Sequence, residues 1–210
     1  MRRPKRRRLR SPSSRTTDSR PSSLRVGDPY DDAVALTQYY TATTLDGFIA
    51  DPDNSLEWLF TRAQDKDGPQ NYTAFIARVG ALAMGATTYE WILDHEGSRW
   101  PYEVPCWVFT HRDLAVVPDA PITFIQGEVG PVHAEMLEAA GDRNVWIVGG
   151  GDLAGQFADA GLLDEVIVSI APVTIGAGAP LLPRRVELRL EELGRNGDFA
   201  AGRFAVVRGD

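Results

Sequence analysis

The distribution of apolar and polar positions along the chain predicts strands that alternate with helices. Apolar runs rich in aromatic and β-branched residues, typical of strands, occupy residues 33–43, 104–114, 121–127, 144–151 and 164–173. Amphipathic segments typical of helices occupy residues 67–80, 131–141 and 152–162, and residues 81–92 combine a short strand with a helix start. Residues 186–207 have the pattern of two antiparallel strands. This order predicts an α/β domain with a mostly parallel central sheet, flanking helices and antiparallel C-terminal strands.

Local signals refine two of the predicted helices. Asp67 is placed to cap the helix of residues 67–80, and Gly80 is placed to end it. Residues 87–90, with the sequence Thr-Thr-Tyr-Glu, have the form of a capping box at the start of the next helix. Residues 46–54 contain dense turn signals, so we expect a loop there.

Charge is distributed unevenly between the N-terminus and the rest of the 210 residues. Residues 1–28 contain ten Lys and Arg against two acidic residues, whereas the remainder contains 12 basic and 27 acidic residues. Because residues 1–28 lack the apolar content needed for a core, we expect a disordered basic tail before one domain of residues 29–210. The alternative is an arm that contacts nucleic acid or another anionic surface.

Composition also disfavours several classes of protein. The acidic body argues against a nucleic-acid-binding domain. Cys106 is the single cysteine, and the tail lacks the apolar stretch of a secretory signal, so we expect a cytoplasmic protein without disulfides. Residues 166–183 are uncharged but contain three prolines, so no membrane segment is expected. The three histidines are isolated and no Cys-x-x-Cys is present, so no metal site is expected.

Three consecutive glycines, residues 149–151, stand between a predicted strand and a predicted helix. With Ala154 they match the pattern G-x-G-x-x-A, whose backbone N–H groups and helix dipole favour a phosphate. A Rossmann fold is disfavoured, because the motif comes late in the chain and Asp164 and Glu165 precede the next strand instead of following it. The alternative is that the glycines only permit tight packing of the helix on the sheet.

Two other predicted strand ends carry polar groups. Gly85 ends one strand before Thr87 and Thr88 open a helix, and Thr110 and His111 follow another strand. In an open α/β sheet such strand ends lie along one edge, where ligands bind. Helix N-termini and hydroxyl groups along one edge suit an elongated phosphate-bearing ligand, and a dinucleotide fits better than a small metabolite.

Four segments in this order resemble the dihydrofolate-reductase-like superfamily: residues 41–59, 84–92, 108–112 and 146–166. The chain is most similar to a bacterial family related to the C-terminal reductase domain of the riboflavin-biosynthesis bifunctional deaminase-reductase, from about Ala33 onward. The resemblance implies a three-layer fold, an NADPH-dependent reductase and a homodimer. It also implies that the cofactor is bound by Ala42, Ile49, Gly85, Thr87, Thr88, Thr110, His111, Gly149, Gly150, Gly151, Asp152, Leu153 and Gln156.

Two departures from the pattern of dihydrofolate reductases matter. Ala86 stands where they commonly place an arginine for the 2′-phosphate of the cofactor, so NADH is not excluded, and His111 and Arg112 are candidate substitutes for that charge. No carboxylate matches the one that binds the pterin, which argues against folate as substrate. Asp46 and Glu57 are the candidate proton donors. The alternatives are a turn-forming role for Asp46 and an ordinary surface position for Glu57.

The leading hypothesis from the sequence is a reductase that uses NADPH on a small heterocyclic or carbonyl-bearing substrate. The alternative is an NADP(H)- or nucleotide-binding protein of the same fold without turnover, which the missing pterin-type carboxylate suggests.

Overall fold

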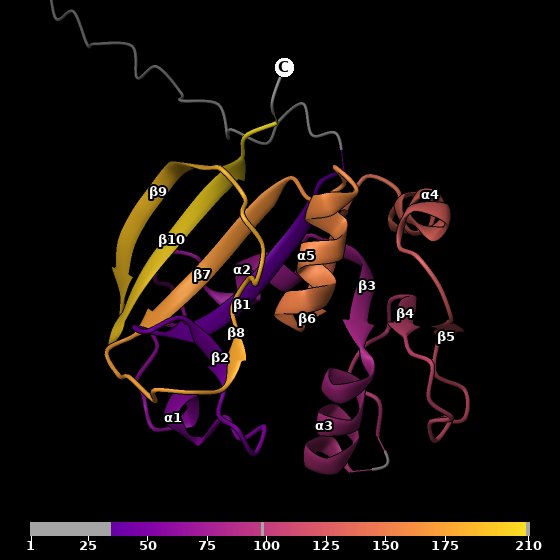
Figure 1. The fold of residues 1–210 in the computed structure, drawn as a ribbon, viewed down its shortest axis with the longest axis horizontal. Coiled ribbons are helices and arrows are strands. Elements are labelled where there is room, and N and C mark those ends of the chain that lie inside the picture. The colour runs from indigo at the N-terminus through magenta and orange to yellow at the C-terminus, as the bar shows by residue number, and fades with distance from the viewer. Residues whose placement is uncertain (1–34, 98, 209–210) are drawn as a thin grey trace, which may run out of the picture. The chain divides into compact units, whose positions relative to one another are not determined.

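The computed structural model describes residues 35–97 and 99–208. The predicted tail of residues 1–28 therefore lies outside the described residues. The central sheet contains eight strands, which run from left to right in Figure 1 in the following order. They are β9 (Leu188–Asn196), β10 (Phe199–Val206), β7 (Glu165–Ala171), β1 (Thr37–Thr44), β6 (Asn144–Gly149), β3 (Val79–Gly85), β4 (Cys106–Phe109) and β5 (Ile122–Ile125).

The strand directions confirm the predicted sheet. The six strands from β7 to β5 are parallel, whereas β10 pairs antiparallel with β7 and β9 pairs antiparallel with β10. The chain adds β3, β4 and β5 on one side of β1 and then places β6 between β3 and β1. The order in which strands are added across the sheet therefore reverses at β6. Two short strands, β2 (Phe48–Ala50) and β8 (Ala179–Pro180), form a separate antiparallel pair that the turn signals of residues 46–54 did not reveal.

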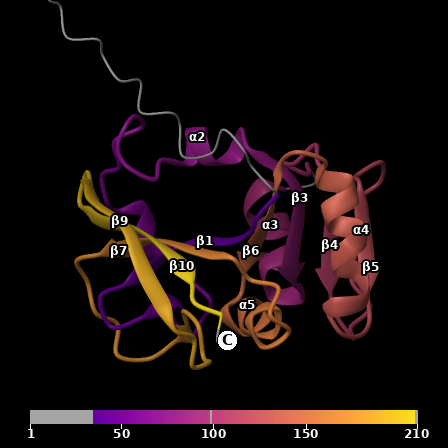
Figure 2. The ribbon, with the colours of Figure 1, turned by 90° about the horizontal axis from the view of Figure 1, so that it is seen from above.

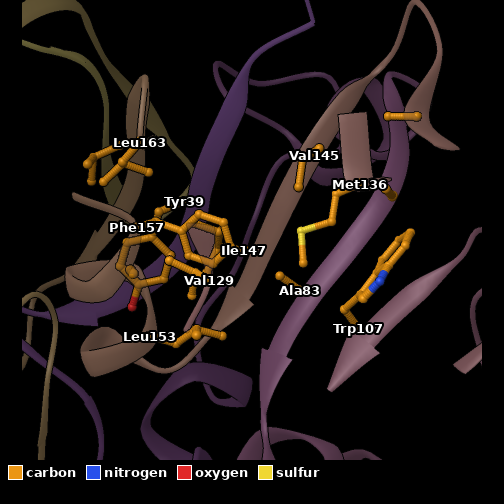
Figure 3. Close-up of a cluster of buried hydrophobic side chains, with 14 of the residues drawn as sticks. Tyr39, Ala83, Trp107, Val129, Met136, Val145, Ile147, Leu153, Phe157 and Leu163 are labelled. Carbon is orange, nitrogen blue, oxygen red and sulfur yellow. The ribbon is translucent and has the colours of Figure 1, made fainter. Parts of the chain in front are cut away.

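Helices cover both faces of the sheet and make three layers (Figure 2). On one face, α4 (Gly130–Ala140) and α5 (Gly151–Asp159) contribute Met136 and Phe157 to a core with Tyr39 and Ile147 of the sheet (Figure 3). On the other face, α2 (Tyr72–Ile76) and α3 (Ala86–Glu96) pack Phe75 and Tyr89 on Leu82 and Val108. Complete burial of one large apolar side chain contributes about 2 kcal/mol.

The helix predicted for residues 67–80 is wrong in its extent. The helix α2 begins only after Asn71, whose side-chain oxygen accepts a hydrogen bond from the N–H of Ala74 at 2.9 Å. Gly80 does not end a helix but lies within β3, where a Cβ atom would stand 2.4 Å from the carbonyl oxygen of Ala140. The close approach of α4 to the strand therefore requires glycine at this position.

The capping box predicted at residues 87–90 is also wrong. The helix α3 starts directly at the end of β3, with Gly85 as its N-cap and no side-chain hydrogen bond to the cap. Thr87 and Thr88 consequently lie inside the first turn. Glu90 forms an ion pair with Arg112 at 2.9 Å instead of closing a box.

At the amino-terminal ends of β6, β1 and β7, polar side chains form a buried network. The amide of Asn144 donates to Gln38 at 2.9 Å, and the amide of Gln38 donates to Glu165 at 2.7 Å. Arg203 of β10 donates to the other carboxylate oxygen of Glu165 at 2.8 Å. Each of these four side chains thus has at least one hydrogen-bond partner in the network.

A short helix, α1 (Glu57–Phe60), precedes α2 and follows the segment of residues 46–54 where the sequence predicted a loop. None of the helices among the described residues combines the length and apolar character needed to cross a bilayer.

Candidate functional site

A cavity of about 460 Å³ opens beyond the carboxyl ends of β3 and β6. Its walls come from the first turns of α3 and α5, from β2 with the loop after it, and from β8. Ten of the thirteen residues predicted to bind a dinucleotide line it: Ile49, Gly85, Thr87, Thr88, Gly149, Gly150, Gly151, Asp152, Leu153 and Gln156. The parallel strands bring these distant segments together because all their carboxyl ends meet at one edge.

Two helices point their N-termini at this cavity. The N-caps are Gly85 for α3 and Gly150 for α5, and no side chain of the described residues caps either helix. The first N–H groups of each helix therefore lack a side-chain acceptor, and the helix dipole adds partial positive charge. Thr88 adds a hydroxyl group to the lining. Such an arrangement can bind an anion through the backbone.

The three glycines between β6 and α5 have different roles. A Cβ atom on Gly151 would stand 2.2 Å from the carbonyl oxygen of Pro180, and one on Gly149 would stand 2.9 Å from the hydroxyl of Thr88. At Gly150 the nearest atom would be a methyl carbon of Ile49 at 3.8 Å. The packing interpretation thus applies to Gly151 and Gly149, whereas a Cβ atom at Gly150 would make only an ordinary van der Waals contact. The peptide bond between Gly149 and Gly150 is cis.

Asp152 is the one charged residue among those that line the cavity. Its carboxylate accepts hydrogen bonds from Gln156 at 2.9 Å and from Arg184 at 2.8 Å, and these bonds hold the pKa of Asp152 below its usual value. Arg184 also pairs with Asp159 at 2.9 Å. The negative charge beside the N-terminus of α5 is therefore partly compensated, and in the described part of the chain no Lys or Arg lines the cavity itself.

Three predicted cofactor residues do not line the cavity. Ala42 lies in β1 beside Thr41, which does line it. The N–H of Thr110 donates to Ile125 at 2.9 Å, and its hydroxyl accepts the N–H of Arg112. His111 is exposed. The expected replacement for the arginine missing at position 86 is therefore not found at the cavity, because Arg112 pairs with Glu90 and His111 does not reach the lining.

The two candidate proton donors also lie outside this cavity. The carboxylate of Asp46 accepts hydrogen bonds from the hydroxyl of Thr44 and from the N–H groups of Ile175 and Gly176, the last at 2.7 Å. The bond from Thr44 is the main cause of a lowered pKa of Asp46. These contacts favour the turn-forming role of Asp46, because its carboxylate fixes one loop against another. Glu57 is exposed and lines a neighbouring pocket.

Several lining residues were missed by sequence reasoning. Trp91 stands one helical turn after Thr87 and Thr88, so the spacing of α3 could have indicated it. Asn54 and Leu56 come from the loop after β2, and Pro180 and Pro183 come from the segment around β8. Those residues reach the cavity only through the pairing of β2 with β8, for which the sequence contains no local signal.

The comparisons with known proteins agree with this architecture. The family model of the RibD C-terminal domain matches residues 37–194. The uncharacterized protein YwjB of Bacillus subtilis is 33% identical over 159 residues, which cover 74% of this chain and 88% of YwjB.

Two solved structures extend the likeness to the fold. A protein from Shewanella sp. PV-4, named for riboflavin biosynthesis, is 25% identical with a TM-score of 0.70 and covers 82% of this chain and 99% of its own. Dihydrofolate reductase from Enterococcus faecalis in complex with NADP(H) is 14% identical with a TM-score of 0.52, covering 83% and 97%. The fold is therefore dihydrofolate-reductase-like, and the chain belongs to the RibD C-terminal domain family.

Proposed function

We propose that the protein is an NADPH-dependent reductase of a small heterocyclic or carbonyl-bearing substrate. The family is one of reductase-like domains, which supports an oxidoreductase. The observation that carries the proposal is the cavity between the N-termini of α3 and α5, which no side chain of the described residues caps, with room for a Cβ atom at Gly150. The E. faecalis neighbour is an NADP(H) complex, and this supports the choice of cofactor.

The cavity fits a dinucleotide in its chemistry. The N–H groups that begin α5 at Gly150 and Gly151 would hold the pyrophosphate, and those of α3 with Thr87 and Thr88 would hold phosphate and ribose oxygens. Ile49, the central residue of β2, would supply an apolar wall for the nicotinamide. A bound nicotinamide cofactor supplies the hydride, and the protein contributes orientation and the exclusion of water.

The described residues that line the cavity supply no good general acid to protonate the substrate. Asp152, its one ionisable lining residue, is held in the charged form by Gln156 and Arg184. A carboxylate with a lowered pKa is a poor general acid. The proton would then come from water, from the substrate, or from a group in the neighbouring pocket such as Glu57.

That Asp152 is a poor general acid also favours a second function, which is binding of NADP(H) or a related nucleotide without turnover. The two functions differ in the consumption of the cofactor. If NADPH binds but is not oxidised in the presence of pteridines, pyrimidines or quinones, the binding function is favoured.

Titration with NADPH and NADH tests the cofactor. Trp91 lines the cavity, so binding should quench tryptophan fluorescence and transfer energy to the reduced nicotinamide. We expect saturable binding of NADPH. A stronger response to NADH would show that the 2′-phosphate is not recognised, and no response to either would rule out the reductase.

We also infer a homodimer that forms through the edge strand β9. Among residues 35–97 and 99–208 no strand pairs with the outer side of β9, and the strand exposes Leu188, Leu190 and Leu193. An apolar edge of this kind is a site of strand pairing with a second copy. Light scattering should show a dimer that Leu193→Lys converts to a monomer, and a monomeric wild-type protein would contradict the inference.

A further inference from the structure

A second pocket adjoins the cavity and shares four residues with it. This outer pocket also has a volume of about 460 Å³ and lies between the loop after β2, α1 and the outer face of α3. Asn54, Leu56, Thr87 and Trp91 line both spaces. The two are therefore parts of one cleft, and a molecule in the outer pocket lies directly beside the proposed cofactor site.

Aromatic rings form one wall of the outer pocket. The rings of Phe60 and Trp91 are stacked with centroids 6.2 Å apart and an interplanar angle of 15°. Trp91 stacks in turn on His95 at 3.8 Å and 17°. Phe60 is 65% exposed, which leaves a large apolar ring open to solvent at the pocket. A flat ring that stacked here would cover this apolar surface.

Negative charge surrounds the aromatic wall. Asp53, Glu57 and Asp94 line the pocket, and their carboxylates form no hydrogen bond or ion pair with any of residues 35–97 and 99–208. Glu90 also lines it but pairs with Arg112. Among the residues that the structure describes, no Lys or Arg lines either pocket. In the described part of the chain, no three carboxylate, imidazole or thiol groups converge to hold a metal.

Carboxylates beside tryptophan and phenylalanine rings favour an organic cation. The rings attract a positive charge through their π faces, and the carboxylates add Coulomb attraction. The same charges repel a phosphate or carboxylate group on a ligand. The inner cavity shows the opposite preference, because its helix N-termini favour anions.

We propose that the outer pocket is the substrate pocket and that it takes a flat heterocycle with a basic amino group that is positively charged at neutral pH. A heterocycle that carries a phosphate is disfavoured there. This inference rests on the proposed reductase, because it is the cofactor in the inner cavity that makes the outer pocket a substrate site.

Two acridines of matched shape test the charge preference. 9-Aminoacridine is a cation at neutral pH, and acridine-9-carboxylate is an anion. The full-length protein is titrated with each, with and without NADPH, at low and at high salt. We expect 9-aminoacridine to bind at least about tenfold more tightly at low salt, and added salt to reduce the difference because the carboxylates are exposed.

Two sets of variants locate the site. The double variant Glu57→Gln/Asp94→Asn should reduce the preference for the cation about fivefold or more. The double variant Glu135→Gln/Glu138→Gln removes the same charge from exposed positions of α4 and should leave the preference unchanged. Phe60→Ala should weaken binding of 9-aminoacridine about two- to fivefold, as expected for an exposed cation–π contact. None of these variants should change NADPH binding.

The outcomes separate this inference from the proposed function. Equal binding of the two acridines, or a preference that survives Glu57→Gln/Asp94→Asn, would overturn the inference even if NADPH binds. If NADPH fails to bind while the preference and its loss in the variant persist, the pocket is an organic-cation site and the reductase proposal fails.

Discussion

The two edges of the central sheet use their polar groups in opposite ways. At the amino-terminal edge, Asn144, Gln38, Glu165 and Arg203 satisfy one another in a buried chain of hydrogen bonds. At the carboxyl-terminal edge, the N-termini of α3 and α5 face a cavity, and no side chain within residues 35–97 and 99–208 caps them. The polar groups of the first edge bond to one another and stabilise the fold, whereas the backbone N–H groups at the second edge can bind a ligand. Substitutions at one edge should therefore change unfolding, and those at the other should change binding.

The largest effect on stability is expected from Glu165→Ala. This change leaves the buried amide of Gln38 without its acceptor and removes a carboxylate that Arg203 contacts at 2.8 Å. Breaking a buried ionic network in this way typically lowers the free energy of unfolding by about 3 to 5 kcal/mol. Urea denaturation measures the loss, and the exposed Glu138→Ala serves as the control with a change below about 0.5 kcal/mol. A loss below about 1 kcal/mol for Glu165→Ala would contradict a stabilising role of this edge.

At the other edge, Gly150→Asp should abolish cofactor binding while the protein remains folded. The side chain has space, since the nearest atom to an added Cβ is 3.8 Å away, but its charge would oppose the pyrophosphate. We expect NADPH to bind at least about 100-fold more weakly, which equals about 2.7 kcal/mol. Fluorescence titration measures the affinity and circular dichroism checks the fold. Unchanged affinity would remove the glycine loop from the cofactor site.

Gly151→Ala and Gly150→Ala form a matched pair within the same loop. The methyl group at position 151 would collide with the carbonyl oxygens of Pro180 and Leu181, and overpacking against backbone costs about 2 kcal/mol. The methyl group at position 150 makes only an ordinary contact with Ile49. Thermal denaturation should therefore separate the two variants. Equal stability would show that the segment around β8 moves away readily.

The contrast between these neighbours shows what the sequence can predict. Gly85, Thr87 and Thr88 and the triple glycine could be placed at one edge, because each follows a parallel strand and the topology brings strand ends together. The individual roles of Gly150 and Gly151 could not be assigned, because Pro180 and Leu181 lie about thirty residues further along the chain. The length of the helix predicted for residues 67–80 was overestimated for a related reason. Gly80 is needed for the close approach of α4 to β3, and it does not end a helix in its own segment.

Ala86→Arg should sharpen selectivity at the carboxyl-terminal edge. Position 86 lines the cavity, and none of the Lys and Arg residues within 35–97 and 99–208 does so. A guanidinium there could form a charge-assisted hydrogen bond to the 2′-phosphate and raise the preference for NADPH over NADH about tenfold. Ala86→Gln, of similar length but uncharged, is the control. If affinity for both cofactors rises equally, the arginine acts on a group that the two share.

The smallest expected effect returns to the amino-terminal edge, where His133 of α4 forms a hydrogen bond with the hydroxyl of Thr37 at 2.7 Å. Partial burial lowers the pKa of His133, and the charge of Asp164, which also pairs with Arg208, opposes this only in part. The folded state thus favours the neutral ring, so the stability that His133 contributes is complete above its unfolded pKa of about 6.5 and declines as the pH falls below it. His133→Gln should make the free energy of unfolding less dependent on pH between about 7.5 and 5.5. Ala134→Gln, at an exposed position of the same helix, controls for the altered surface and should keep the wild-type dependence. If His133→Gln keeps it too, the titration belongs to other groups of this edge.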